Sequence, residues 1–248
     1  MSRTYQTSTQ PPKDPTAFVN GQLAVQAPFH LEATVRVLQR RASNRVDVWT
    51  GERYLRLIKL MNELALVRIA NLGSIDEPHL EYSILAGPHS LTAHAAIRQV
   101  FTRILALDVD PAPLQQLANI DSILHSTTSS LRGMRPPRFA DLFESFASVI
   151  PFQQLSLDAG ISILGKLVER FGEHLTYQGH RYFAFPTARA IAEVPVEELS
   201  ACGLSAKKAQ TLREIARAID DGALTEHSLA TLDSRAAIAR LVELPGVG

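Results

Sequence analysis

The chain of 248 residues contains a single cysteine, Cys202, and no apolar run as long as the roughly 18 residues that a membrane-spanning helix needs. One cysteine cannot form an internal disulfide, which excludes a disulfide-stapled fold and favours a reducing, cytoplasmic compartment. The first segment, residues 1–15, is rich in Ser, Thr, Gln and Pro and lacks the apolar core of a secretory signal. We therefore expect a flexible tail there and no membrane association.

The sequence also lacks an excess of charge of either sign. Lys and Arg together number 25, as do Asp and Glu, and charged residues make up 20% of the chain against 46% apolar residues. This composition excludes a disordered chain, because it supplies enough apolar side chains for packed cores. A neutral protein has to hold an anionic partner through local basic patches and not through its overall field.

Two local basic patches are present. Residues 122–140 contain three arginines and no acid, and within this stretch Arg132 and Arg135 are our candidates for phosphate contacts. A second cluster, between residues 31 and 57, has six arginines against three acids; its arginines are Arg36, Arg40, Arg41, Arg45, Arg53 and Arg56. The alternative for both patches is a solvated surface whose arginines form ion pairs within the molecule.

The first part of the chain, residues 16–110, has the pattern of an α+β domain. Apolar residues at helical spacing predict helices over His30–Arg41 and Ser90–Leu107. Between them lie short β-rich runs bounded by turn residues, which are Arg45–Trp49, Tyr54–Leu60, Glu63–Asn71 and His79–Leu85. We expect an antiparallel meander covered by the two helices.

The second part, residues 111–248, shows no convincing strand and is predicted to be all-helical. Apolar residues recur at spacings of three and four over Ser156–Phe171. A second helix is expected to begin after Ser205 and to end at Gly222, and Asp233 can cap a third. The sequence therefore predicts two domains of different class.

The last predicted helix runs into a glycine-bearing loop formed by Pro245, Gly246, Val247 and Gly248. Two glycines one residue apart can adopt positive φ, which turns the backbone so that successive N–H groups point the same way. Such a loop can hold a phosphate oxygen through backbone donors and thereby bind a nucleic-acid backbone without reading its sequence. The alternative is a plain turn.

A second candidate contact is the amide pair Gln153 and Gln154, which lies between two predicted helices. An amide side chain is flat, can insert between bases, and can donate to and accept from base edges in the minor groove. The alternative is that both amides cap the adjoining helix ends.

Taken in order, these segments resemble the helix-hairpin-helix DNA glycosylase superfamily, and specifically its DNA-3-methyladenine glycosylase II branch. The resemblance covers roughly residues 23–248. The segments that carry it are Ala27–Phe29, Val46–Trp49, Arg132–Arg138, Val149–Ser156, Phe185–Thr187, Leu199–Leu212 and Leu244–Gly248.

The resemblance implies an α+β fold with a TBP-like N-terminal sheet, followed by an all-α glycosylase domain that is incomplete at its C-terminus. It implies a monofunctional enzyme that flips alkylated bases out of double-stranded DNA and hydrolyses their N-glycosidic bonds. Flipping costs a few kcal/mol, so a side chain must fill the vacated stack. By the resemblance Gln154 is the side chain that fills the vacated stack, which we call the wedge, and Gln153 lies beside it. The resemblance also implies that Arg132, Arg135 and the glycine-bearing loop contact DNA.

The resemblance extends to the base pocket and to the state of the protein. Aromatic rings stack well on a cationic alkylated base, and Phe29 and Tyr177 are the candidates for that pocket. The resemblance implies a monovalent cation held by backbone carbonyls of the glycine-bearing loop, and no other cofactor or metal is expected. The implied protein is a monomer associated with the bacterial nucleoid.

The resemblance places the catalytic aspartate beyond Gly248. Hydrolysis through an oxocarbenium-like sugar needs a carboxylate near the anomeric carbon. No catalytic residue is therefore assigned in this chain, which we expect to be C-terminally truncated and inactive on its own. Two explanations stay open, a fragment of a longer glycosylase and a non-catalytic DNA-binding module with the same fold.

Overall fold

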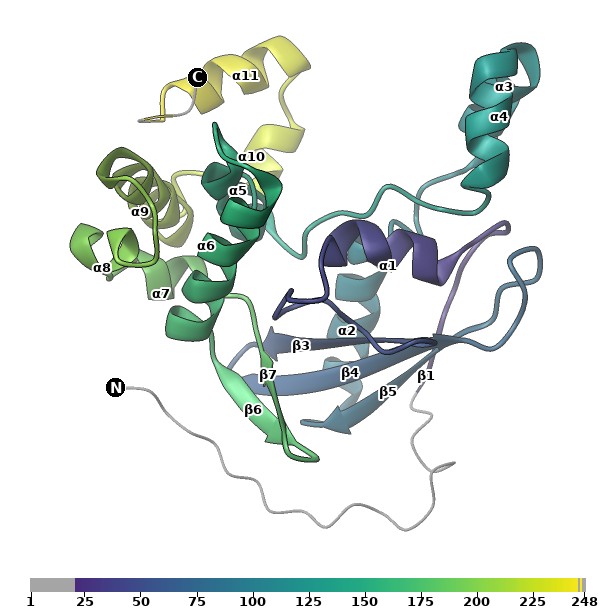
Figure 1. The fold of residues 1–248 in the computed structure, drawn as a ribbon, viewed down its shortest axis with the longest axis horizontal. Coiled ribbons are helices and arrows are strands. Elements are labelled where there is room, and N and C mark those ends of the chain that lie inside the picture. The colour runs from purple at the N-terminus through teal and green to yellow at the C-terminus, as the bar shows by residue number, and fades with distance from the viewer. Residues whose placement is uncertain (1–20, 245, 247–248) are drawn as a thin grey trace. The chain divides into compact units, whose positions relative to one another are not determined.

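The computed structural model describes residues 21–244 and residue 246 (Figure 1). The expected tail at residues 1–15 lies outside the described residues. Contacts within the molecule divide the chain into two compact units. Unit 1 comprises Met1–Ala140 and His174–Ala184, and unit 2 comprises Asp141–Glu173 and Phe185–Gly248.

Unit 1 is built on a five-stranded antiparallel sheet in the order β1-β5-β4-β3-β2. Its strands are β1 (Gly21–Leu23), β2 (Val48–Trp49), β3 (Arg53–Leu60), β4 (Glu63–Asn71) and β5 (Leu80–Ala86). The predicted meander is confirmed. The edge strand β1 was not predicted, because a strand of three residues is too short to show an alternating pattern.

One face of this sheet is covered by the two predicted helices, α1 (Leu31–Gln39) and α2 (Leu91–Ile104). The Ser90 side chain caps α2 by accepting a hydrogen bond from the Ala93 N–H at 3.1 Å. Helix and strand side chains share one core here, and the ring of Phe101 on α2 meets that of Tyr54 on β3 edge to face. The expected α+β layer is confirmed.

The opposite face of the sheet is covered by a β-hairpin from much later in the chain. Leu57 and Leu66 face each other across β3 and β4, and both pack with Ala184 at the end of the hairpin. Its turn residues Gln178 and Gly179 have φ of 48° and 80°, as a type I′ turn requires. The strands are β6 (His174–Tyr177) and β7 (His180–Phe183). The expectation of no strand after residue 110 is therefore wrong here.

The segment between α2 and residue 140 also belongs to unit 1. It contains a pair of helices, α3 (Ala112–Ile120) and α4 (Ser122–Ser130), and then returns to α1. There the Gly133 carbonyl accepts from the His30 N–H at 2.7 Å, and the Thr34 hydroxyl accepts from the Arg135 N–H at 3.1 Å. These contacts place the boundary between the units at residues 140 and 141, whereas the sequence suggested 110 and 111.

Unit 2 is helical throughout its described residues. Its elements are α5 (Leu142–Ala147), the 3-10 turn η1 (Ile150–Phe152), α6 (Leu157–Phe171), α7 (Ala188–Ala192), α8 (Val196–Ser200), α9 (Ala206–Asp220), α10 (Glu226–Ala230) and α11 (Ser234–Val242). The predicted caps Ser205 and Asp233, and Ser156 at the start of α6, each accept from a backbone N–H three residues on. None of the described helices is both long and apolar enough to cross a membrane.

Candidate nucleic-acid interface

Gln153 and Gln154 form an exposed turn between η1 and α6 of unit 2. Gln154 has φ of +58°, a left-handed conformation that non-glycine residues rarely adopt and that often marks functional sites. The side chains of Val149, Leu155 and Leu157 around the turn are also half exposed. The turn therefore presents amides and apolar groups together, as an insertion into stacked bases requires.

The path of the chain into this turn depends on a glycine in α6. A Cβ placed on Gly160 would lie 2.3 Å from Cδ1 of Phe152, the last residue of η1. The ring of Phe152 therefore occupies the space that any other side chain at position 160 would fill. This packing fixes the residue immediately before Gln153.

Neither glutamine side chain caps a helix. The α6 cap is Ser156, whose hydroxyl accepts from the Ala159 N–H at 3.3 Å, and at the end of η1 only the backbone of Gln153 is engaged by Ile150. No hydrogen bond of either side-chain amide is found in the described part of the chain. Of the two interpretations left open by the sequence, the structure favours the one in which the amides are available to a partner.

Gly246 and the glutamine turn both lie against α9. Lys208 of α9 donates a hydrogen bond from Nζ to the Gln153 carbonyl. Three residues further along the helix, the side chain of Thr211 lies against Gly246, where a Cβ would come within 2.1 Å of Oγ1. Residues three apart are neighbours on a helix surface, so the structure places Gly246 and the glutamine turn on neighbouring positions of α9.

Gly246 has φ of +81°, which confirms the left-handed backbone expected at this glycine. The other three members of the predicted loop, Pro245, Val247 and Gly248, lie outside the described residues. Their backbone contacts and the monovalent cation stay predictions. Among the residues that are described, no group of three His, Cys, Asp or Glu side chains could hold a metal ion.

The arginines of residues 122–140 have acidic or carbonyl partners within unit 1. Arg132 is exposed and forms an ion pair with Asp76 at 2.5 Å. Arg135 is buried, and its guanidinium donates to the backbone carbonyls of Gln26, Ala106 and Val109. Arg135 cannot reach a phosphate from this position, so its predicted DNA contact is wrong. Burial also lowers the pKa of this guanidinium.

The two aromatic candidates for a base pocket do not come together. Phe29 is fully buried in the core beneath α1 and α2, and Tyr177 packs in the cluster on the opposite face of the sheet. A residue with no exposed surface cannot stack on a flipped base in this structure. The predicted pocket built from this pair is therefore not formed.

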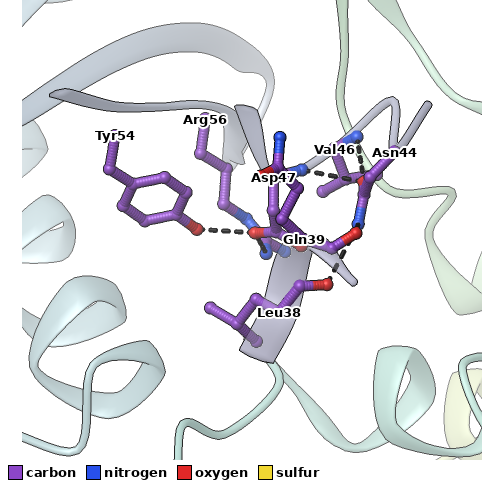
Figure 2. A network of polar contacts seen from close by, with 7 residues as sticks. All are labelled: Leu38, Gln39, Asn44, Val46, Asp47, Tyr54 and Arg56. Carbon is purple, nitrogen blue, oxygen red and sulfur yellow. Dashed lines mark hydrogen bonds and ion pairs between the residues drawn. The ribbon is translucent and has the colours of Figure 1, made fainter. Parts of the chain in front are cut away.

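The second basic cluster contains a buried ion pair and not a row of free cations. Figure 2 shows Asp47 accepting hydrogen bonds from Tyr54 Oη at 2.6 Å and from Arg56 Nη1 at 2.7 Å. The side chain of Asn44 holds this loop in place, because its oxygen accepts from the N–H groups of Val46 and Asp47. Arg56 is 2% exposed, so it serves the fold of unit 1 and not a partner.

The buried phenol of Tyr54 makes the stability of unit 1 depend on pH in the alkaline range. Burial, and then the nearby Asp47 carboxylate, raises the pKa of Tyr54 well above its ordinary value of about 10. The unfolded state loses this proton near pH 10 while the folded state retains it, so stability falls as pH rises past that value. We expect denaturant midpoints to drop between about pH 9 and 11. The Tyr54→Phe variant should show a shallower drop, and an identical drop in both proteins would contradict this role.

Two protein-family descriptions match successive parts of the chain. Residues 20–141 match the AlkA N-terminal domain, and residues 147–245 match the HhH-GPD superfamily base excision DNA repair protein. Between them the two matches cover nearly all of the described residues of both units.

Relatives and solved structures agree with these matches. A DNA-3-methyladenine glycosylase of Bacillus subtilis (strain 168) is 28% identical over 142 residues, which cover 57% of this chain and 47% of the relative. DNA-3-methyladenine glycosylase 2 of Escherichia coli (strain K12) is 24% identical over 90% of this chain and 74% of its own length. The structure of the 3-methyladenine DNA-glycosylase of Archaeoglobus fulgidus superposes with a TM-score of 0.73 at 24% identity, covering 92% of this chain and 75% of that protein. The chain thus spans about half to three-quarters of the length of these proteins.

Proposed function

We propose that this chain, which matches the AlkA N-terminal domain and the HhH-GPD superfamily of base excision DNA repair proteins in turn, binds duplex DNA at damaged bases as part of a DNA glycosylase for alkylated bases. One observation carries this proposal. The exposed Gln153–Gln154 turn and Gly246 of the glycine-bearing loop rest on neighbouring positions of α9. A backbone-binding loop beside a flat, insertable side chain is what a protein needs to hold a duplex and occupy a vacated stack.

The proposal assigns a role to each part of this surface. Gln154 enters the base stack, and Gln153 contacts the minor-groove edges of the bases beside it. The glycine-bearing loop holds a phosphate through backbone N–H groups. The reaction is hydrolysis of the N-glycosidic bond, and the protein acts as a cytoplasmic monomer on the bacterial chromosome. Because no catalytic residue is assigned in this chain, excision of 3-methyladenine from alkylated DNA by a protein that also contains the catalytic aspartate, and not by this chain alone, would distinguish a glycosylase from a non-catalytic DNA-binding module with the same fold.

The binding proposal is tested with three competing polyanions. We expect the chain to bind a duplex containing a tetrahydrofuran abasic analogue more tightly than the same duplex intact, and more tightly than heparin. The measurement is fluorescence anisotropy at several salt concentrations, because phosphate contacts make the affinity salt-dependent. Equal affinity for the abasic duplex and for heparin would contradict the proposal.

Gln154→Ala should weaken binding of the abasic duplex by about three- to tenfold, which corresponds to about 0.7 to 1.4 kcal/mol. The reason is that alanine removes the side chain that fills the vacated stack. Gln178→Ala is a matched control, because Gln178 is also an exposed glutamine with positive φ but lies in the β6–β7 turn of unit 1. An equal loss in both variants would argue against a wedge at Gln154.

A further inference from the structure

Lys208 makes a contact that its place in the helix does not favour. It lies in the first turn of α9, where the helix dipole disfavours a positive charge. Its Nζ donates to the backbone carbonyl of Gln153, 55 residues earlier in the chain, at 2.5 Å. The ammonium of Lys208 therefore contacts the glutamine turn and not a residue of its own helix.

The acceptor of this contact belongs to the peptide group that precedes Gln154. The carbonyl oxygen of Gln153 and the N–H of Gln154 lie in one rigid plane, so fixing that oxygen fixes the start of residue 154. Gln154 has a left-handed backbone, which costs roughly 1–2 kcal/mol for a residue with a Cβ. A conformation of that cost persists only where surrounding contacts determine it.

Contacts with α6 hold the chain on either side of this peptide plane. Before it, Phe152 packs against Gly160 of α6. After it, the Leu155 N–H donates to the Phe152 carbonyl at a long 3.3 Å, and Ser156 caps α6. The side chains of both glutamines are exposed. Between these two anchors, the Lys208 ammonium donates to the Gln153 carbonyl.

We propose that Lys208 is a positioning residue, whose ammonium holds the Gln153–Gln154 peptide plane and thereby keeps the Gln154 side chain directed toward the DNA. This inference rests on the proposed function of Gln154 as the wedge. It differs from a direct phosphate contact, in which Lys208 would add to affinity through its charge and not through the turn.

The two roles give different salt dependence. A lost phosphate contact lowers the slope of log affinity against log salt by about 0.9, whereas a misplaced wedge weakens binding at every salt concentration without changing that slope. We expect Lys208→Met to weaken binding of the abasic duplex by about threefold or more with the slope unchanged. Lys208→Arg keeps a cationic donor and should restore most of the affinity. Lys207→Met, a neighbouring lysine change, is the control.

Two further measurements report on the turn itself. A 2-aminopurine base beside the abasic analogue brightens when it is unstacked, and Lys208→Met should lose this signal while Lys207→Met retains it. In the Gln154→Ala background, Lys208→Met should cause no additional loss, because two residues acting through one wedge are not additive. A reduced salt slope with an unchanged 2-aminopurine signal, or full additivity with Gln154→Ala, would overturn the proposal.

Amide hydrogen exchange separates failure of this inference from failure of the proposed function. Without DNA, exchange at Leu155 should be faster in Lys208→Met than in the wild type and unchanged in Lys207→Met. A wild-type chain that does not prefer the abasic duplex overturns the proposed function, and with it the DNA role of Lys208. Unchanged exchange in Lys208→Met, in a chain that does prefer that duplex, overturns the Lys208 contact alone.

Discussion

Replacing Asp47 with alanine is expected to lower the free energy of unfolding of unit 1 by about 3–5 kcal/mol. The Asp47 carboxylate accepts from Tyr54 Oη and balances the charge of Arg56, whose side chain is almost fully buried. Alanine removes that negative charge while the guanidinium stays in the core, and a buried charge without its counter-ion is among the costliest defects in a fold. Asp47→Asn should be intermediate, because it keeps an acceptor but not the charge.

The measurement can be confined to unit 1. Trp49 is the chain's one tryptophan, and it packs against the core that α1 and α2 share with the sheet. Its fluorescence during denaturant unfolding therefore reports on the unit that contains Asp47. Asp76→Ala is the control, because the pair of Asp76 with Arg132 is exposed and should contribute less than about 1 kcal/mol. Equal shifts in the two variants would show that the buried network does not stabilise unit 1.

The parts of the fold that the sequence predicted are those that local chemistry determines. A serine or aspartate at the N-cap position accepts from a backbone N–H three residues on, which is a local contact, and Ser90, Ser156, Ser205 and Asp233 do so at helix starts that the sequence predicted. Strands β3, β4 and β5 were recognisable as β-rich runs bounded by turn residues, although burial on both faces leaves them without a strict alternation of apolar and polar residues.

The parts that the sequence did not predict depend on contacts between distant residues. The β6–β7 hairpin is stabilised by the sheet of unit 1, more than a hundred residues earlier, and the Gln178-Gly179 turn was its one local signal. The stretch around Arg132 contains no acid, yet Asp76 from the β4–β5 connection supplies one. Charge counts along a chain therefore say little about which arginines are available to DNA.

The candidate site contains both kinds of feature, those that the sequence predicted and those that depend on contacts between distant residues. Gly246 was identified from the turn chemistry of its glycine-bearing loop, whereas the resemblance to the glycosylase family assigned the wedge role to Gln154. Their shared support on α9 has no local signature. Nothing in the sequence pairs Lys208 with Gln153 or Thr211 with Gly246, since these contacts arise from the packing of α9 against the glutamine turn and against Gly246.

Gly160 and Gly165 of α6 should respond in opposite directions to the same change. A Cβ at Gly160 would lie 2.3 Å from the Phe152 ring, whereas a Cβ at Gly165 meets nothing within 4 Å. Gly160→Ala should therefore lower the free energy of unfolding by about 1–3 kcal/mol through overpacking. Gly165→Ala should raise it by about 0.5–1 kcal/mol, because alanine loses less backbone entropy in a helix interior.

The readout is the loss of helical circular dichroism with denaturant, together with amide exchange along α6 to assign the change to unit 2. Because Phe152 directly precedes Gln153, Gly160→Ala should also weaken binding of the abasic duplex, while Gly165→Ala leaves binding unchanged. Stabilisation by both alanines would mean that the Phe152 ring yields without cost, and that the glutamine turn does not depend on its contact with α6.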